Sequence, residues 1–192
     1  SGAITTDLDV VGSVGTSDVL NIVNAATGTN TFDTNNDVFE TINLVAFSTT
    51  ADPTIVTGAY SLGTPAGTGV LTINGAGLGV GNVVTITGTD AATPMSITTG
   101  IAADDITLGT KADTIVSGAG NDTITGTAGA NNITAGDGVD TVALGTGAET
   151  IDMGAGNDII TAAGNLANTD IIDGGAGTDT LTTTTGITSA SV

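Results

Sequence analysis

The sequence predicts an all-β protein whose C-terminal half is a parallel β-roll, a form of β-solenoid. Three observations predict this fold. An acidic or amide residue recurs every nine residues, an aliphatic residue stands two positions after each one, and glycines precede them at fixed offsets. A short fixed period indicates a repeat architecture, in which stacked units bury a core that one unit could not bury alone.

The nine-residue repeat occupies residues 99–182 and comprises nine units. Its acidic or amide positions are Asp104, Asp113, Asp122, Asn131, Asp140, Glu149, Asp158, Asp170 and Asp179. Its aliphatic positions are Ile106, Ile115, Ile124, Ile133, Val142, Ile151, Ile160, Ile172 and Leu181. The spacing is nine residues throughout, except for twelve between Asp158 and Asp170.

Each unit is expected to form a six-residue turn followed by a three-residue strand such as Thr123–Thr125. Glycine supplies positive φ in the turn and lets neighbouring main chains approach closely. Thr, Ile and Val dominate the strand positions, as β structure prefers. Because side chains alternate along a strand, the central aliphatic residue points inward and its two neighbours point outward.

The pattern resembles the nonapeptide G-G-x-G-x-D-x-U-x of RTX proteins, in which U is a large aliphatic residue. The units that begin at Ser117 (Ser-Gly-Ala-Gly-Asn-Asp) and Gly174 (Gly-Gly-Ala-Gly-Thr-Asp) carry the resemblance most clearly. It implies a right-handed parallel β-roll that binds several calcium ions. It also implies type I secretion to an extracellular or bacterial cell-surface location.

In RTX β-rolls one coil comprises two nonapeptides, so alternate turns lie on opposite edges. The sequence alternates in the same way, because Gly118–Asp122 recurs unchanged at Gly154–Asp158, four units later. The first edge therefore carries Asp104, Asp122, Asp140, Asp158 and Asp179. The second edge carries Asp113, Asn131, Glu149 and Asp170, and its turns are irregular, with Lys111 in place of a glycine.

Calcium takes six to eight oxygen ligands, which aspartates and main-chain carbonyls of successive turns can supply. The predicted ligands are the five first-edge aspartates together with Gly118, Gly120, Gly136, Gly138, Gly154, Gly156, Gly175 and Gly177. Asp113, Asn131, Glu149 and Asp170 are the weaker candidates. The alternative is a degenerate roll in which the aspartates only cap turns.

Residues 1–98 lack the nonapeptide but are also β-rich. Apolar, β-branched runs at residues 19–23, 70–73 and 83–87 predict strands separated by Gly, Asn, Asp and Pro turns. We expect an irregular β-solenoid or β-sandwich that continues the roll. The predicted organisation is thus 1–98, the roll at 99–182, and a tail at 183–192.

The charge balance excludes several functions. Twenty acidic residues against one basic residue, Lys111, give a net charge of −19, so nucleic acid is excluded as a partner. No apolar run reaches the ~18 residues that would predict a transmembrane helix. The chain has no His, Cys or Arg, so catalytic triads, thiolates and imidazole-bound zinc are excluded. We expect no enzymatic activity.

Two functions remain. The first is a secreted structural protein that folds on binding calcium and assembles into an extracellular layer or filament. Its low-complexity composition supports this, and residues 38–44 are similar to linking segments of RTX-type S-layer proteins. The second is the calcium-binding module of a large RTX adhesin, for which more than the observed 2% of aromatic residues would be expected. The expected partners are further copies of the chain, with a cell-surface polysaccharide as another candidate.

Overall fold

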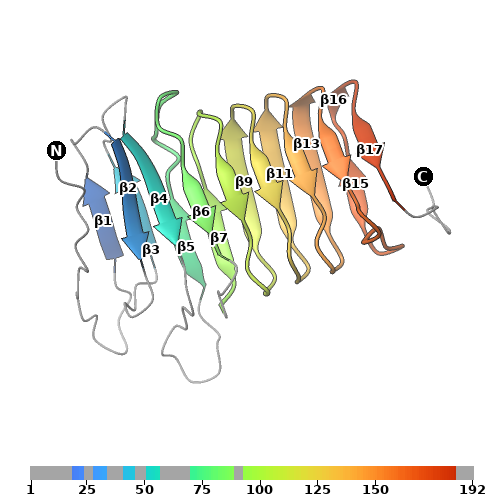
Figure 1. The fold of residues 1–192 in the computed structure, drawn as a ribbon, viewed down its shortest axis with the longest axis horizontal. Coiled ribbons are helices and arrows are strands. Elements are labelled where there is room, and N and C mark those ends of the chain that lie inside the picture. The colour runs from blue at the N-terminus through green and yellow to red at the C-terminus, as the bar shows by residue number, and fades with distance from the viewer. Residues whose placement is uncertain are drawn as a thin grey trace.

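The computed structural model describes residues 19–23, 28–33, 41–45, 51–56, 70–88 and 93–184. The described chain forms two parallel β-sheets, and successive strands from β1 to β15 alternate between them. Each coil therefore contributes a strand to each sheet. The coils follow one another along the long axis of the molecule, from the N-terminal to the C-terminal end (Figure 1). The predicted parallel β-solenoid is confirmed.

The nine-stranded sheet contains the odd-numbered strands from β1 to β15 and one additional short strand. In spatial order they are β1 (Val19–Val23), β3 (Thr41–Val45), β5 (Leu71–Asn74), β7 (Met95–Thr98), β9 (Thr114–Ala119), β11 (Asn132–Asp137), β13 (Thr150–Gly156) and β15 (Ile171–Asp173). The additional strand is β16 (Ala176–Gly177), which also pairs with β13.

The eight-stranded sheet contains the remaining strands. From the C-terminal end they are β17 (Thr180–Thr182), β14 (Ile159–Thr161), β12 (Thr141–Ala143), β10 (Thr123–Thr125), β8 (Asp105–Thr107), β6 (Thr85–Thr87), β4 (Ala51–Val56) and β2 (Gly28–Asp33). No helix in the described part of the chain is long and apolar enough to cross a membrane.

The repeat sets the register of both sheets. Thr123 pairs with Thr141, and cross-coil hydrogen bonds join residues 18 apart, which is two nonapeptides. After the twelve-residue unit the separation becomes 21 residues, as between Asp158 and Asp179. The extra residues lie between β14 and β15, so Ile160 still pairs with Leu181. The insertion therefore leaves the stacking of the coils intact.

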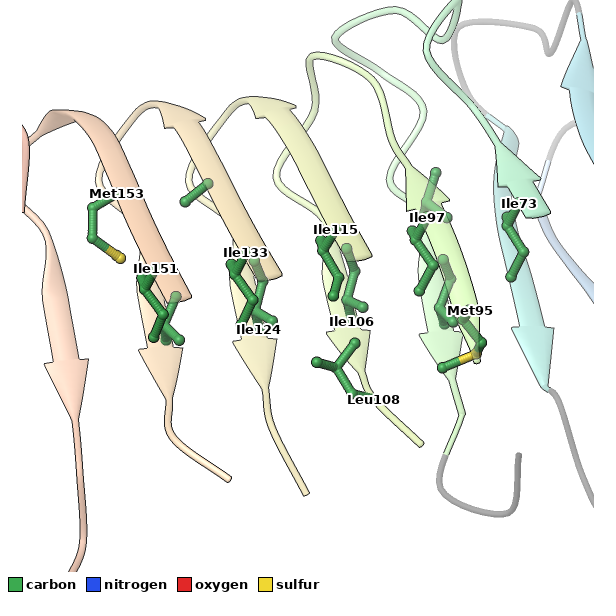
Figure 2. Close-up of a cluster of buried hydrophobic side chains, with 14 of the residues drawn as sticks. Ile73, Met95, Ile97, Ile106, Leu108, Ile115, Ile124, Ile133, Ile151 and Met153 are labelled. Atoms are coloured by element: carbon green, nitrogen blue, oxygen red, sulfur yellow. The ribbon is translucent and has the colours of Figure 1, made fainter. Parts of the chain in front are cut away.

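The core lies between the two sheets (Figure 2). It is built from one inward column on each sheet: Ile97, Ile115, Ile133 and Ile151 face Ile106, Ile124, Val142 and Ile160. All of these side chains are at most 2% exposed, which confirms the predicted inward positions from Ile106 to Ile160. Ile172 is only partly buried and Leu181 is 42% exposed. Both belong to the last described coil, and no further described coil packs against it.

Several strands of the nine-stranded sheet are longer than the three residues predicted. β9, β11 and β13 have 6, 6 and 7 residues. They extend because the inward alternation continues beyond the isoleucine, so Ser117 follows Ile115 into the interior. Glycines of the adjoining turn then pair across coils, as Gly118 does with Gly136. The core therefore has a second inward column on this sheet, made of Thr99, Ser117, Ala135 and Met153.

The N-terminal strands continue both sheets of the roll with parallel pairing, as the solenoid alternative expected. Residues 19–23 form β1 as predicted. The strand expected at 70–73 is observed one residue later, as β5 (Leu71–Asn74), and the strand expected at 83–87 is shorter, as β6 (Thr85–Thr87). Of the S-layer-like segment, residues 41–44 belong to β3 and residues 38–40 lie outside the described residues. The tail is described only at residues 183–184.

Candidate calcium-binding edge

The first-edge turns stack with their main chains in close approach. Gly136 and Gly138 have φ values of +111° and +149°, which L side chains rarely adopt. A Cβ atom at either position would collide with a carbonyl oxygen of the previous coil, that of Gly118 or Gly120 respectively. The same close approach to the previous coil is found at all eight glycines predicted from the motif, Gly118, Gly120, Gly136, Gly138, Gly154, Gly156, Gly175 and Gly177.

Hydrogen bonds connect each first-edge aspartate to the next. Oδ1 of one aspartate accepts from the main-chain N–H of the equivalent aspartate one coil earlier. The N···O distances are 2.7 Å for Asp104–Asp122, 2.8 Å for Asp122–Asp140, 2.8 Å for Asp140–Asp158 and 3.0 Å for Asp158–Asp179. The structure thus brings together all five aspartates that the sequence assigned to this edge.

The second carboxylate oxygens of this row have no hydrogen-bond partner. Oδ2 is buried and unsatisfied in Asp104, Asp122, Asp140 and Asp158, side chains that are at most 2% exposed. A buried polar atom without a partner costs about 1–3 kcal/mol, and more when it is charged. Four such atoms in one row are the feature that a bound cation would satisfy. Carboxylate oxygens are also the ligands that calcium prefers, so these residues fit the ion.

Side-chain carboxylates alone do not complete a metal site. Among the described residues, no three or more acidic side chains gather closely enough to hold an ion by themselves. Calcium needs six to eight oxygens, so carbonyl, hydroxyl or water oxygens must supply the remainder. The closely stacked glycine turns place carbonyl groups beside this row.

Burial makes Asp104, Asp122 and Asp140 of the first edge difficult to ionise. Desolvation raises the pKa of Asp122 and of Asp140 to about 6, and the charges of neighbouring aspartates add to the effect. Main-chain hydrogen bonds lower the pKa but do not cancel the rise. Burial also raises the pKa of Asp104. A cation beside the row would favour the ionised form.

The second edge has the same chain of hydrogen bonds but no unsatisfied oxygen. Main-chain N–H groups donate to the next residue at 2.9 Å (Asp113 to Asn131), 3.2 Å (Asn131 to Glu149) and 3.0 Å (Glu149 to Asp170). The remaining oxygens have donors within the protein: Gly109 N for Asp113, Asn131 Nδ2 for Glu149, and Ala167 N for Asp170. Burial raises the pKa of Asp113 and of Glu149 here too.

One position that faces the interior was not predicted from the sequence. It stands five residues before the acid or amide of each unit, and we call its occupant the wall residue. The nonapeptide assigns this position to its first glycine, so its side chain was not considered. Thr99 and Ser117 occupy it on the first edge, are buried, and donate to carbonyl oxygens of the next coil, each at 2.8 Å. Extending the two-residue alternation from Ile115 to Ser117 would have found it.

Comparison with known proteins agrees with this geometry. A family model for the RTX calcium-binding nonapeptide repeat matches four stretches, residues 98–133, 107–142, 125–160 and 167–187. No curated protein matches the chain, and no solved structure does. RTX nonapeptide repeats bind calcium ions, and the matched residues are those that form the stacked turns. Residues 98–160 and 167–187 are therefore RTX calcium-binding nonapeptide repeats, and they build a parallel β-solenoid.

Proposed function

We propose that calcium ions bind along the first edge, held by residues of successive turns. Their ligands are the carboxylates of Asp104, Asp122, Asp140, Asp158 and Asp179, with main-chain carbonyls of the predicted glycine turns. The observation that carries this proposal is the row of four buried carboxylate oxygens without a hydrogen-bond partner. Calcium supplies positive charge and additional coordination there, which offsets the desolvation of the row.

The second edge holds its turns together without an ion. Asp113, Asn131, Glu149 and Asp170 were the weaker ligand candidates, and their side chains are hydrogen-bonded to protein groups. Binding calcium there would require breaking such bonds, for example the one from Gly109 N to Asp113 Oδ2. We therefore assign calcium to one edge of the solenoid.

Calcium then acts as a folding switch that depends on the compartment. Extracellular calcium modules bind with Kd on the order of 10⁻⁴–10⁻³ M, too weakly for occupancy in the cytosol. RTX proteins are typically secreted by type I systems. An ion that binds only the folded state adds its binding free energy to folding, so the repeat region folds after export.

The folded protein serves a structural role outside the cell, as a self-assembling component of a bacterial surface layer or filament. A β-solenoid of RTX repeats is a calcium-binding structural fold and is not typically catalytic. The regular coils of the described chain and its Thr-, Gly- and Ala-rich sequence support a scaffold. The alternative is the calcium-binding module of an RTX adhesin, whose partner would be a cell-surface polysaccharide.

Electron microscopy of the purified chain separates these two roles. In millimolar calcium we expect sheets or filaments, and excess chelator should disperse them. Dispersed monomers that are folded in calcium and bind cell-surface polysaccharide would instead support the adhesin module. Asp140→Asn is a useful control, because assembly that depends on the calcium-ordered edge should require a higher calcium concentration in this variant.

A further inference from the structure

The wall residues differ along the first edge. In successive coils they are Thr99, Ser117, Ala135 and Met153, and all are at most 2% exposed. They form the second inward column of the nine-stranded sheet, beside the first-edge turns. Met153 projects into the space between the sheets in Figure 2. Each of the four aspartates with an unsatisfied oxygen therefore has a different wall residue in its own unit.

The first two wall residues carry oxygen. The Thr99 hydroxyl lies close to the Asp104 carboxylate and the Ser117 hydroxyl close to the Asp122 carboxylate, but neither hydroxyl forms a hydrogen bond with Oδ2. Each hydroxyl proton can be donated to the next coil, to Ser117 O and Ala135 O respectively. A hydroxyl has one proton and two lone pairs, so its oxygen can still coordinate a cation beside the carboxylate.

The next two wall residues cannot do this. Ala135 has only a methyl group, and Met153 has a soft thioether that suits calcium poorly as a ligand. On the second edge the equivalent positions hold the buried side chains of Leu108 and Leu144. Hydroxyl wall residues are therefore confined, within units 99–158, to the coils of Asp104 and Asp122.

We propose that Thr99 and Ser117 provide hydroxyl ligands to the calcium ions held at Asp104 and Asp122. The edge then has two classes of site, tighter ones at the N-terminal coils and weaker ones at Asp140 and Asp158, and calcium orders the N-terminal coils first. This inference rests on the proposed function. It adds a set of affinity-determining residues that the nonapeptide pattern does not contain.

Removing the hydroxyls from the full-length chain tests the inference. Calorimetric calcium titration of the unaltered chain should resolve two classes of site. Thr99→Val and Ser117→Ala should each weaken the tighter class about threefold to tenfold, the range expected for one lost polar interaction. Thr127→Val is the matched control, because Thr127 Oγ1 also donates to a carbonyl of a neighbouring coil, that of Gly109, but on the second edge.

A lanthanide probe separates ligation from a merely structural role. Terbium substitutes for calcium, and its luminescence lifetimes in H₂O and D₂O report how many waters the bound ion holds. Replacing a hydroxyl ligand should add bound water in Thr99→Val and Ser117→Ala but not in Thr127→Val. Ala135→Ser should do the reverse, removing bound water and strengthening the weaker class, so the inference stays testable if a loss variant fails to fold.

These experiments separate two hypotheses, ligation of calcium by the wall residues and binding of calcium along the first edge. If the unaltered chain binds calcium, but the terbium hydration of Thr99→Val, Ser117→Ala and Ala135→Ser equals that of the unaltered chain, the wall residues are not ligands and the first-edge assignment stands. If the unaltered chain binds no calcium, or Asp140→Asn loses none, the first-edge assignment itself is wrong.

Discussion

Oδ1 of Asp140 accepts a hydrogen bond from the main-chain N–H of Asp122 at 2.8 Å, while Oδ2 of the same carboxylate is buried without a partner. On the opposite edge, Glu149 accepts from the main-chain N–H of Asn131 at 3.2 Å, and its other oxygen accepts from the Asn131 amide at 3.5 Å. The two edges share a main-chain arrangement. They differ in whether donors within the protein form hydrogen bonds with both oxygens of the acidic side chain.

This difference predicts unequal responses to removal of one charge. Asp140→Asn keeps an oxygen that can accept from Asp122 but replaces the unsatisfied oxygen by an NH₂ group, which cannot bind calcium. We expect fewer bound ions and a higher calcium midpoint for folding. Glu149→Gln, the matched variant, should change both little. Calorimetric titration measures both quantities, and equal calcium loss in the two variants would show that both edges bind ions.

Folding of the repeat region should depend on calcium and not on magnesium. Excess chelator should remove most of the β signal in circular dichroism, and millimolar calcium should restore it. Magnesium should not restore it, because this smaller ion demands near-ideal octahedral geometry and releases its water reluctantly. Full β structure in excess chelator would disprove the folding switch.

Acid should partly replace calcium. Burial raises the pKa of Asp122 and Asp140 in the folded chain to about 6, against 3.8 for an ordinary aspartate carboxyl. Between pH ~4 and pH ~6 the folded, calcium-free chain binds more protons than the unfolded chain. The contribution of these two carboxyls to stability is therefore greatest below pH ~4 and is lost as pH rises through ~6. In chelator, the β signal should therefore be larger at pH 4.5 than at pH 7. Asp122→Asn with Asp140→Asn should reduce this pH response, and an undiminished response would assign it to other groups.

The inward column should not tolerate charge. Ile133→Asp places a carboxylate at a position that is 2% exposed, among aliphatic side chains that cannot pair with it. Burying such a group costs several kcal/mol, so we expect no calcium-induced β signal in circular dichroism. Asn132→Asp adds the same charge at the exposed neighbouring position and should fold normally. Normal folding of Ile133→Asp would contradict the observed register.

The glycine turns should be equally intolerant of a side chain. Gly138→Ala combines a φ of +149° with a collision against the carbonyl oxygen of Gly120, so we expect a loss of at least about 1 kcal/mol in unfolding free energy. Gly77→Ala is the control, because a Cβ there meets nothing within 4 Å. Urea unfolding at fixed calcium compares the two, and equal stabilities would mean that the first-edge turns stack less closely than described.

Most of the repeat architecture could be predicted from the sequence. These predicted features are the nine-residue period, the inward row from Ile106 to Ile160 and the alternation of turns between two edges. All three are local properties of the sequence that recur from unit to unit. Stacking preserves such properties, because each coil repeats the geometry of the one before it. The assignment of calcium to named first-edge residues remains a prediction, supported by their unsatisfied oxygens.

Tertiary structure alone decided three further features. It placed Ser117 in the interior, where the motif expects a glycine, and it continued both sheets through the N-terminal strands, where the sequence allowed a solenoid or a sandwich. It also satisfied Asp113 Oδ2 with the N–H of Gly109 while leaving Asp122 Oδ2 with no donor. The sequence determines which residues recur, but whether a buried oxygen finds a donor depends on how turns pack across coils 18 residues apart, and this only the folded chain decides.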